Sequence, residues 1–140
     1  MKSIMRLLSV TALLFASTAI ADEAESDDCL RTKIWEGYSE GWAVRTATNT
    51  ELAQGETKIY LVTLYAGNRY KFLVCGDESA VDLDLRLHDG EGEIVQYDAT
   101  ENAEPTVEFV PTRTDTYYVA VVAEELEGET GSVAMAVTYQ

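Results

Sequence analysis

Residues 81–88 alternate strictly between apolar and polar side chains, and this alternation constrains the fold more than any other feature of the chain. The apolar positions are Val81, Leu83, Leu85 and Leu87, and the polar positions are Asp82, Asp84, Arg86 and His88. Because successive side chains of a β-strand point to opposite faces, the pattern predicts a strand with one face in a core and one in water. The following Asp-Gly-Glu-Gly at 89–92 predicts a turn.

Six other segments have the length and composition of strands, and an eighth strand would lie near 42–47. The six are 57–65, 69–75, 93–97, 106–110, 116–123 and 132–139. Ala66, Gly67 and Asn68 form a turn signal that predicts a hairpin between the first two of them. Seven or eight short strands separated by turns favour an all-β, antiparallel sandwich over a parallel α/β sheet.

The segment before these strands has a helical pattern. From Asp28, a plausible N-cap, apolar residues recur at every fourth position, namely Leu30, Ile34, Tyr38 and Trp42. Glycine in a helix interior is about 1 kcal/mol less favourable than alanine. Gly37 therefore indicates that the helix ends near this residue. We expect residues 22–28 to form a loose acidic lead, and the aromatic stripe to cover the sandwich rather than to bind a ligand.

The chain has two cysteines, Cys29 and Cys75, so only one intramolecular pairing exists. His88 is the sole histidine, which disfavours a metal site built on the cysteines. A disulfide is typical of exported domains and would stabilise a loop of this length by about 4 kcal/mol. Cys75 alternates with Val74, so we expect the helix to cover either the face opposite to that of Val74 or an end of the sandwich.

The first 21 residues have the pattern of a secretory signal peptide. Lys2 and Arg6 precede an apolar stretch at 7–20, and Ala19-Ile20-Ala21 supplies the small-x-small pattern that signal peptidase cleaves. The stretch is short for a membrane span, and no second one follows. We therefore expect cleavage after Ala21, a mature chain that begins at Asp22, no lipid anchor, and a periplasmic or secreted location.

The predicted mature chain is strongly acidic. All 25 acidic residues but only eight of the ten basic residues follow Ala21, which gives a net charge of −17. Such a surface repels nucleic acid and anionic lipid headgroups. The surface is expected to be mainly a solvated acidic face, with a cation or a basic partner as the alternative.

Two patterns raise the alternative of an enzyme. Gly37-Tyr38-Ser39-Glu40-Gly41 matches G-x-S-x-G, but that motif needs a strand before it and a His and an acid beside the serine. Glycosidases need two carboxylates across a cleft, and nothing singles out such a pair among the acids of this chain. We expect no catalytic residues and no cofactor, with hydrolysis as a remote alternative.

Four acids form a candidate calcium site, namely Asp82, Asp84, Asp89 and Glu91. Hard oxygen ligands at such spacings hold Ca²⁺, and a site with so few protein ligands would be weak, with a Kd of about 10⁻⁴–10⁻³ M. The alternative is that the amides of the turn at 90–92 offset the charge without metal. Two carboxylates this close repel each other and raise at least one pKa. His88 on the same face is expected to be solvated.

Tyrosines in the predicted strands offer a further alternative, stacking on sugars or apolar polymers. Amphipathic tyrosine also suits half-buried strands, which is its commoner use. The tyrosines are Tyr60, Tyr65, Tyr70, Tyr97, Tyr117, Tyr118 and Tyr139.

Several motifs in residues 54–139 resemble the bacterial pre-peptidase C-terminal domain. They are YAGNRYKF at 65–72, VDLDLRLHD at 81–89, VEFVP at 107–111 and TYYV at 116–119. The resemblance implies a jelly-roll-like β-sandwich of the kind appended to secreted peptidases and other exported enzymes, where it assists export or holds substrate. The family commonly has Gly where this chain has Asp115, so that turn is expected to differ.

Taken together, the sequence predicts a signal peptide at 1–21, an acidic, Cys-bearing helical segment at 22–53 and a jelly-roll-like sandwich at 54–140. The function expected is that of an exported, non-catalytic accessory or binding module with an unidentified protein or polymer partner. A structural envelope protein and a calcium-stabilised carbohydrate- or polymer-binding module remain alternatives.

Overall fold

The computed structural model describes residues 21–140, which form one helix and eight strands. The proposed signal peptide lies almost entirely outside the described residues. The elements are α1 (Glu23–Ser39), β1 (Ala43–Ala53), β2 (Thr57–Leu64), β3 (Tyr70–Gly76), β4 (Ala80–His88), β5 (Ile94–Asp98), β6 (Thr106–Phe109), β7 (Asp115–Leu126) and β8 (Thr130–Tyr139). This confirms the predicted all-β sandwich with a short N-terminal helix, and β1 is the eighth strand expected near 42–47.

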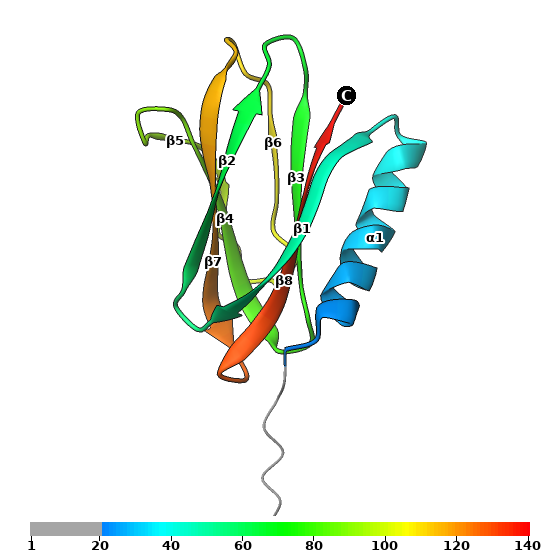
Figure 1. The fold of residues 1–140 in the computed structure, drawn as a ribbon, viewed down its shortest axis with the longest axis vertical. Coiled ribbons are helices and arrows are strands. Elements are labelled where there is room, and N and C mark those ends of the chain that lie inside the picture. Colours follow the sequence, from blue (N-terminus) through cyan, green and yellow to red (C-terminus); the bar gives the residue numbers. More distant parts are fainter. Residues whose placement is uncertain (1–20) are drawn as a thin grey trace, which may run out of the picture.

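The strands form two four-stranded antiparallel sheets that pack face to face (Figure 1). One has the order β1-β8-β3-β6 and carries α1 on its outer face, so we call it the covered sheet. The other has the order β2-β7-β4-β5, and no helix of the described residues lies on its outer face, so we call it the uncovered sheet.

The core lies between the sheets and is built from the alternation seen in the sequence. Leu83, Leu85 and Leu87 of β4 are fully buried in it. The covered sheet faces them with Phe72, Val74, Val133, Met135 and Val137, and the uncovered sheet adds Leu64, Tyr117, Val119 and Val121. Burial of these apolar side chains is the main stabilising contribution to the sandwich.

The predicted hairpin between 57–65 and 69–75 is wrong. β2 pairs with β7 in the uncovered sheet, whereas β3 pairs with β6 and β8 in the covered sheet. The connection at 65–69 therefore crosses from one sheet to the other. The buried hydroxyl of Tyr70 accepts a hydrogen bond from the Tyr65 amide (2.9 Å), which satisfies a backbone donor at this crossing.

The helix α1 begins six residues earlier than the sequence predicted. Asp22, not Asp28, is the N-cap, and its side chain accepts a hydrogen bond from the Glu25 amide. The expected loose lead is therefore the first turn and a half of the helix. Acidic residues in this turn, Glu23 and Glu25, interact favourably with the helix dipole. The helix ends at Ser39, two residues after Gly37.

The helix packs on small side chains of the covered sheet. Its buried Leu30 contacts a cluster formed by Leu73, Cys75, Ala134 and Ala136. The two alanines alternate along β8 with Val133, Met135 and Val137, which face the core instead. A strand with large residues on one side and alanines on the other lets the sandwich fill its core while the helix backbone approaches closely.

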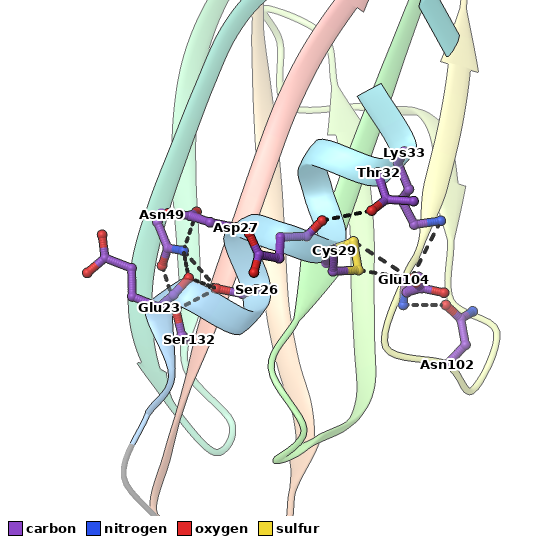
Figure 2. The surroundings of a disulfide bond; sticks show 12 residues. Glu23, Ser26, Asp27, Cys29, Thr32, Lys33, Asn49, Asn102, Glu104 and Ser132 are labelled. Carbon is purple, nitrogen blue, oxygen red and sulfur yellow. Dashed lines mark hydrogen bonds and ion pairs between the residues drawn. A yellow bond between two sulfur atoms is a disulfide. The ribbon is translucent and has the colours of Figure 1, made fainter. Parts of the chain in front are cut away.

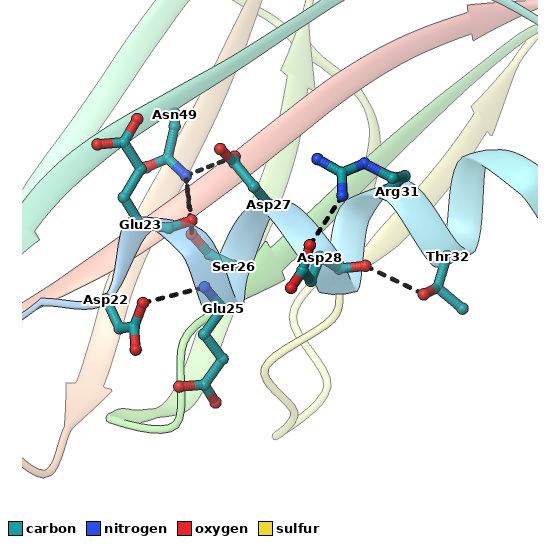
Figure 3. A network of polar contacts seen from close by, with 9 residues as sticks. All are labelled: Asp22, Glu23, Glu25, Ser26, Asp27, Asp28, Arg31, Thr32 and Asn49. Atoms are coloured by element: carbon teal, nitrogen blue, oxygen red, sulfur yellow. Dashed lines mark hydrogen bonds and ion pairs between the residues drawn. The ribbon is translucent and has the colours of Figure 1, made fainter.

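A disulfide and a polar network fix the helix to this sheet. Cys29 of α1 is bonded to Cys75 of β3 (Figure 2). One turn earlier, Asn49 of β1 donates hydrogen bonds to Ser26 Oγ (2.7 Å) and Asp27 Oδ1 (2.8 Å), as Figure 3 shows. Ser26 is itself buried, and its hydroxyl lies 2.8 Å from that of Ser132 on β8.

Candidate functional site

The predicted disulfide is confirmed, and the helix covers the predicted face of β3. Glu104 lies beside the bridge, with Oε1 3.0 Å from Cys29 Sγ. Cys29, Cys75 and Glu104 have their possible metal-ligand atoms within 4.8 Å of one another. Within residues 21–140 they are the one group of three or more His, Cys, Asp or Glu side chains that lie this close. Since the two sulfur atoms are bonded to each other, this group has a structural role.

The predicted calcium ligands do not come together. Asp82 and Asp84 lie in the first half and at the middle of β4, and Asp89 and Glu91 lie in the turn beyond its end. At about 3.3 Å per residue, the strand separates Asp84 from Asp89 by roughly 16 Å. The turn amides serve Asp89 rather than the strand acids, because Asp89 Oδ1 accepts hydrogen bonds from the amides of Glu91 and Glu93, both at 2.9 Å. Calcium binding itself stays a prediction.

Asp84 instead belongs to a charged group on the outer face of the uncovered sheet. It is 5% exposed, and its Oδ2 lies 3.4 Å from Arg86 Nη2, which also pairs with Glu124 at 3.7 Å. Burial first, and then the negative charges of Asp82 and Glu124, raise the pKa of Asp84 to about 6, while Arg86 opposes the shift. The repulsion expected between the paired aspartates is therefore present.

The serine of the G-x-S-x-G pattern lies on a helix rather than on a strand-to-helix turn. Ser39 is the last residue of α1, and its hydroxyl donates to the Glu36 carbonyl (2.8 Å). His88 lies on the uncovered sheet, across the sandwich from α1, with Nδ1 2.9 Å from the Gly92 carbonyl oxygen. The pattern thus lacks the strand before it and the base beside it that a nucleophile elbow requires.

The outer face of the uncovered sheet carries a group of exposed apolar side chains that the sequence analysis missed. Cross-strand register places Leu61, Tyr118, His88 and Ile94 in one row, and Ile59, Ala120, Arg86 and Tyr97 in the next. Residues directly opposite each other in antiparallel strands share a face. Ile59, Leu61, Ile94 and Tyr97 are 51–68% exposed, and we call these four residues the apolar patch.

Acidic groups lie at both ends of the apolar patch. At one end, Asp84 is paired in register with Val122, which in turn pairs with Thr57, two residues before Ile59 on β2. Glu124 follows Val122 on β7. At the other end is the turn with Asp89, Glu91 and Glu93. Arg86, in the second row, forms ion pairs with Asp84 and Glu124. The apolar patch thus consists of two pairs of side chains. Ile59 and Leu61 lie on the edge strand β2, Ile94 and Tyr97 lie on the other edge strand β5, and acids lie at both ends of this face.

A signal for this patch was present in the sequence. In 57–65, both sets of alternating positions are apolar, with Ile59 and Leu61 on one side and Tyr60, Val62 and Leu64 on the other. A strand of a two-layer sandwich buries only one side in the core, so the second apolar side indicates an exposed contact surface. The structure assigns Tyr60, Val62 and Leu64 to the core side.

A hollow lies between α1 and the covered sheet, on the opposite side of the sandwich from the apolar patch. It has a volume of about 170 Å³, and its lining includes Ile34, Trp42, Lys71 and Thr138. Trp42 is buried, with Lys71 Nζ 4.4 Å from its ring centroid. Lys71 also pairs with Glu108 (3.4 Å), so this lysine and the Trp42 ring already have partners within the protein.

The comparisons with known proteins bear on the fold. No protein-family model matches the chain, and no curated protein matches it in sequence. Among solved structures, it is similar to the pre-peptidase C-terminal domain of a collagenase from Bacillus anthracis, with 17% identity and a TM-score of 0.55 over 67% of this chain and 89% of that one. The fold is that of a pre-peptidase C-terminal domain. The resemblance seen in the sequence motifs is confirmed at the level of the fold.

A further similarity is to PliG of Aeromonas hydrophila, a periplasmic inhibitor of g-type lysozyme. The identity is 15% and the TM-score 0.49, over 70% of this chain and 88% of that one. In residues 21–140, no helix has the length and apolar character needed to cross a membrane.

Proposed function

We propose that this protein is an exported, non-catalytic binding module that recognises a basic protein through the outer face of its uncovered sheet. The observation that carries the proposal is the asymmetry of the sandwich. One sheet buries its outer face under α1, whereas the other exposes Ile59, Leu61, Ile94 and Tyr97 on a single surface. Grouped exposed apolar side chains on a soluble domain are typical of protein interaction surfaces.

The charge distribution supports a basic protein as the partner. The predicted mature chain has a net charge of −17, and acids border the apolar patch at both ends. Complementary charge around exposed apolar side chains raises association rates and selects against acidic partners. A basic protein with an apolar spot is therefore the complementary ligand, and its binding is expected to weaken as salt concentration rises.

The arrangement favours a protein over a sugar polymer. Sugar binding through stacking needs several aromatic rings on one platform, but on the outer face of the uncovered sheet, among residues 21–140, Tyr97 is the one aromatic residue that is mostly exposed. The patch has one aromatic ring and three aliphatic side chains, a composition suited to a protein surface. The signal peptide pattern and the disulfide support a location outside the cytoplasm.

Affinity capture with matched variants tests the proposal. The mature protein is immobilised and exposed to the native extracytoplasmic fraction, and retained proteins are identified and purified for Kd measurement. The patch variant is Leu61→Thr/Tyr97→Thr, which keeps strand propensity. The control is Trp35→Gln/Tyr38→Gln, because these two side chains are similarly exposed, at 65% and 67%, on α1.

We expect a basic protein whose Kd rises at least tenfold with the patch variant and changes less than twofold with the helix control. An acidic partner or a polysaccharide ligand would contradict the partner class. Loss of binding in the helix control but not in the patch variant would show that the surface lies elsewhere. Turnover of esterase or peptidase substrates that Ser39→Ala abolishes would contradict the non-catalytic assignment.

A further inference from the structure

Asp77 is a buried carboxylate that receives an unusual number of hydrogen bonds. It follows β3 and is 4% exposed. Its Oδ2 accepts from the amides of Asp22 (2.8 Å) and Ser132 (2.9 Å), and its Oδ1 accepts from the amide (3.0 Å) and the hydroxyl of Ser79. Burial alone would raise the pKa of Asp77, but these hydrogen bonds outweigh it and lower the pKa. Asp77 is therefore ionised at neutral pH.

The surroundings of Asp77 are rich in negative charge and lack a cation. Partial burial, and then the charges of Glu78, Asp22 and Asp77, raise the pKa of Glu25. Among the described residues, no Lys or Arg forms an ion pair with any of these four acids. The hydrogen bonds stabilise the ionised Asp77, and the summed negative charge of the four acids would further favour a cation placed among them.

The donor from Asp22 is the atom that signal peptide cleavage would convert into a cation. In the uncut chain it is a peptide nitrogen with one N–H. Hydrolysis of the Ala21–Asp22 bond adds water, leaves a carboxylate on Ala21 and an amino group on Asp22, and that amino group takes up a proton at neutral pH. The product is an α-ammonium with three N–H donors, held where the peptide N–H already lies 2.8 Å from Asp77 Oδ2.

We propose that the buried carboxylate of Asp77 binds the α-ammonium of Asp22 in the processed chain, so that removal of the signal peptide completes the fold. The ion pair joins the N-cap of α1 to the connection after β3. It acts on the same end of the helix as the contacts of Ser26 with Asn49 and Ser132. The ionised Asp77 carboxylate, 2.8 Å from the Asp22 nitrogen, is expected to outweigh the unfavourable position of a positive charge at a helix N-terminus.

Three forms of the chain test the proposal. The first begins at Asp22 and is released from a fusion cut directly before that residue. The second carries Gly-Ser before Asp22, which keeps a peptide N–H at the position but no charge. The third is the first form with its α-amino group acetylated. Melting temperatures are measured from pH 5 to 11, and the α-amino pKa is measured by NMR.

At pH 7 we expect the free-amine form to melt about 5 °C above the other two. Its α-amino pKa should exceed the ordinary range of about 7.7–8.0, because an adjacent carboxylate favours the charged form. Since this pKa is raised in the folded state, the advantage should be present below about pH 8 and disappear as the pH rises through the folded pKa. Asp77→Asn should remove the difference between the forms.

Equal melting temperatures for the three forms at pH 7, or an ordinary α-amino pKa, would overturn the proposal. So would an exported chain whose N-terminus, read by mass spectrometry, is not Asp22. The NMR titration uses the native sequence, so the test holds even if Asp77→Asn does not fold. The measurements are independent of any binding partner.

Discussion

Asp84 lies two residues beyond Asp82 on the same side of β4, and each aspartate keeps one carboxylate oxygen, Oδ1, buried without a hydrogen-bond partner among the described residues. The cause is the alternation of the strand. Leu83, Leu85 and Leu87 must face the core, so both acids face the outer side together. The pair therefore opposes folding, and Arg86 offsets only part of its charge.

Replacing Asp84 by Asn should stabilise the protein at neutral pH. The pKa of Asp84 is raised to about 6 in the folded state. Between about pH 4 and pH 6 the folded state then binds more protons than the unfolded state, so stability falls as pH rises through this window. Asp84→Asn should raise the free energy of unfolding at pH 7 by about 1–3 kcal/mol and flatten its dependence on pH between 4 and 6.

Urea denaturation at several pH values measures this change. Asp28→Asn is the control, because Asp28 lies on the exposed side of α1, where it pairs with Arg31 at the surface. We expect that variant to change stability by less than about 0.5 kcal/mol. Destabilisation by Asp84→Asn at pH 7 would mean that its contact with Arg86 outweighs the repulsion.

Calcium binding by Asp82 and Asp84 is a separate prediction, and the structure decides which variants test it. Because Asp89 and Glu91 lie at the far end of β4, they cannot share an ion with the strand acids. A melt in about 5 mM Ca²⁺ should then show a higher Tm than one in about 5 mM Mg²⁺, both above the affinity range of weak extracellular sites. The shift should vanish in Asp82→Asn/Asp84→Asn and persist in Asp89→Asn. Equal shifts with both ions would leave the aspartates a purely structural pair.

The faces of individual strands could be predicted from the sequence, but their partners could not. Alternation assigned Leu83, Leu85 and Leu87 to the core correctly, because the side-chain period of a strand is local. Which strand lies beside which is decided by closure of the sandwich. β2 pairs with β7, some 60 residues further along the chain, and the turn-like Gly67 belongs to a crossing between sheets.

The start of α1 was missed for a related reason. Helical periodicity begins at Leu30, whereas the first turn is held by polar contacts with distant strands, through Ser26 to Ser132 and to Asn49. No local pattern contains these partners. Likewise, the acids that surround Asp84 could be named only in part, because Glu124 comes from a neighbouring strand.

Loss of the disulfide should destabilise the sandwich without changing its fold. The Cys29–Cys75 bridge closes a loop across 46 residues and holds α1 over Ala134 and Ala136. Cys29→Ser/Cys75→Ser should lower the free energy of unfolding by about 2–5 kcal/mol. Urea denaturation measures the loss, and reduced wild type should match the variant. Two free thiols in exported, non-reduced protein, detected by mass spectrometry, would contradict the bridge.

Two glycines should respond to alanine in opposite ways. Gly131, at the start of β8, is packed against the Asp77 loop: a Cβ there would lie 2.6 Å from Ser79 Oγ and 3.3 Å from Asp77 Oδ1. Gly131→Ala should push Ser79 away from Asp77, removing hydrogen bonds to a buried carboxylate, and lower the free energy of unfolding by about 2 kcal/mol.

Gly37 lies inside α1, where a Cβ would meet only Trp42 at ordinary contact distances of 3.5–3.8 Å. Gly37→Ala should raise the free energy of unfolding by about 0.5–1 kcal/mol, because alanine favours the helix. Both changes are measured by urea denaturation of the processed chain. A neutral Gly131→Ala would show that the Asp77 loop can move aside without losing its hydrogen bonds.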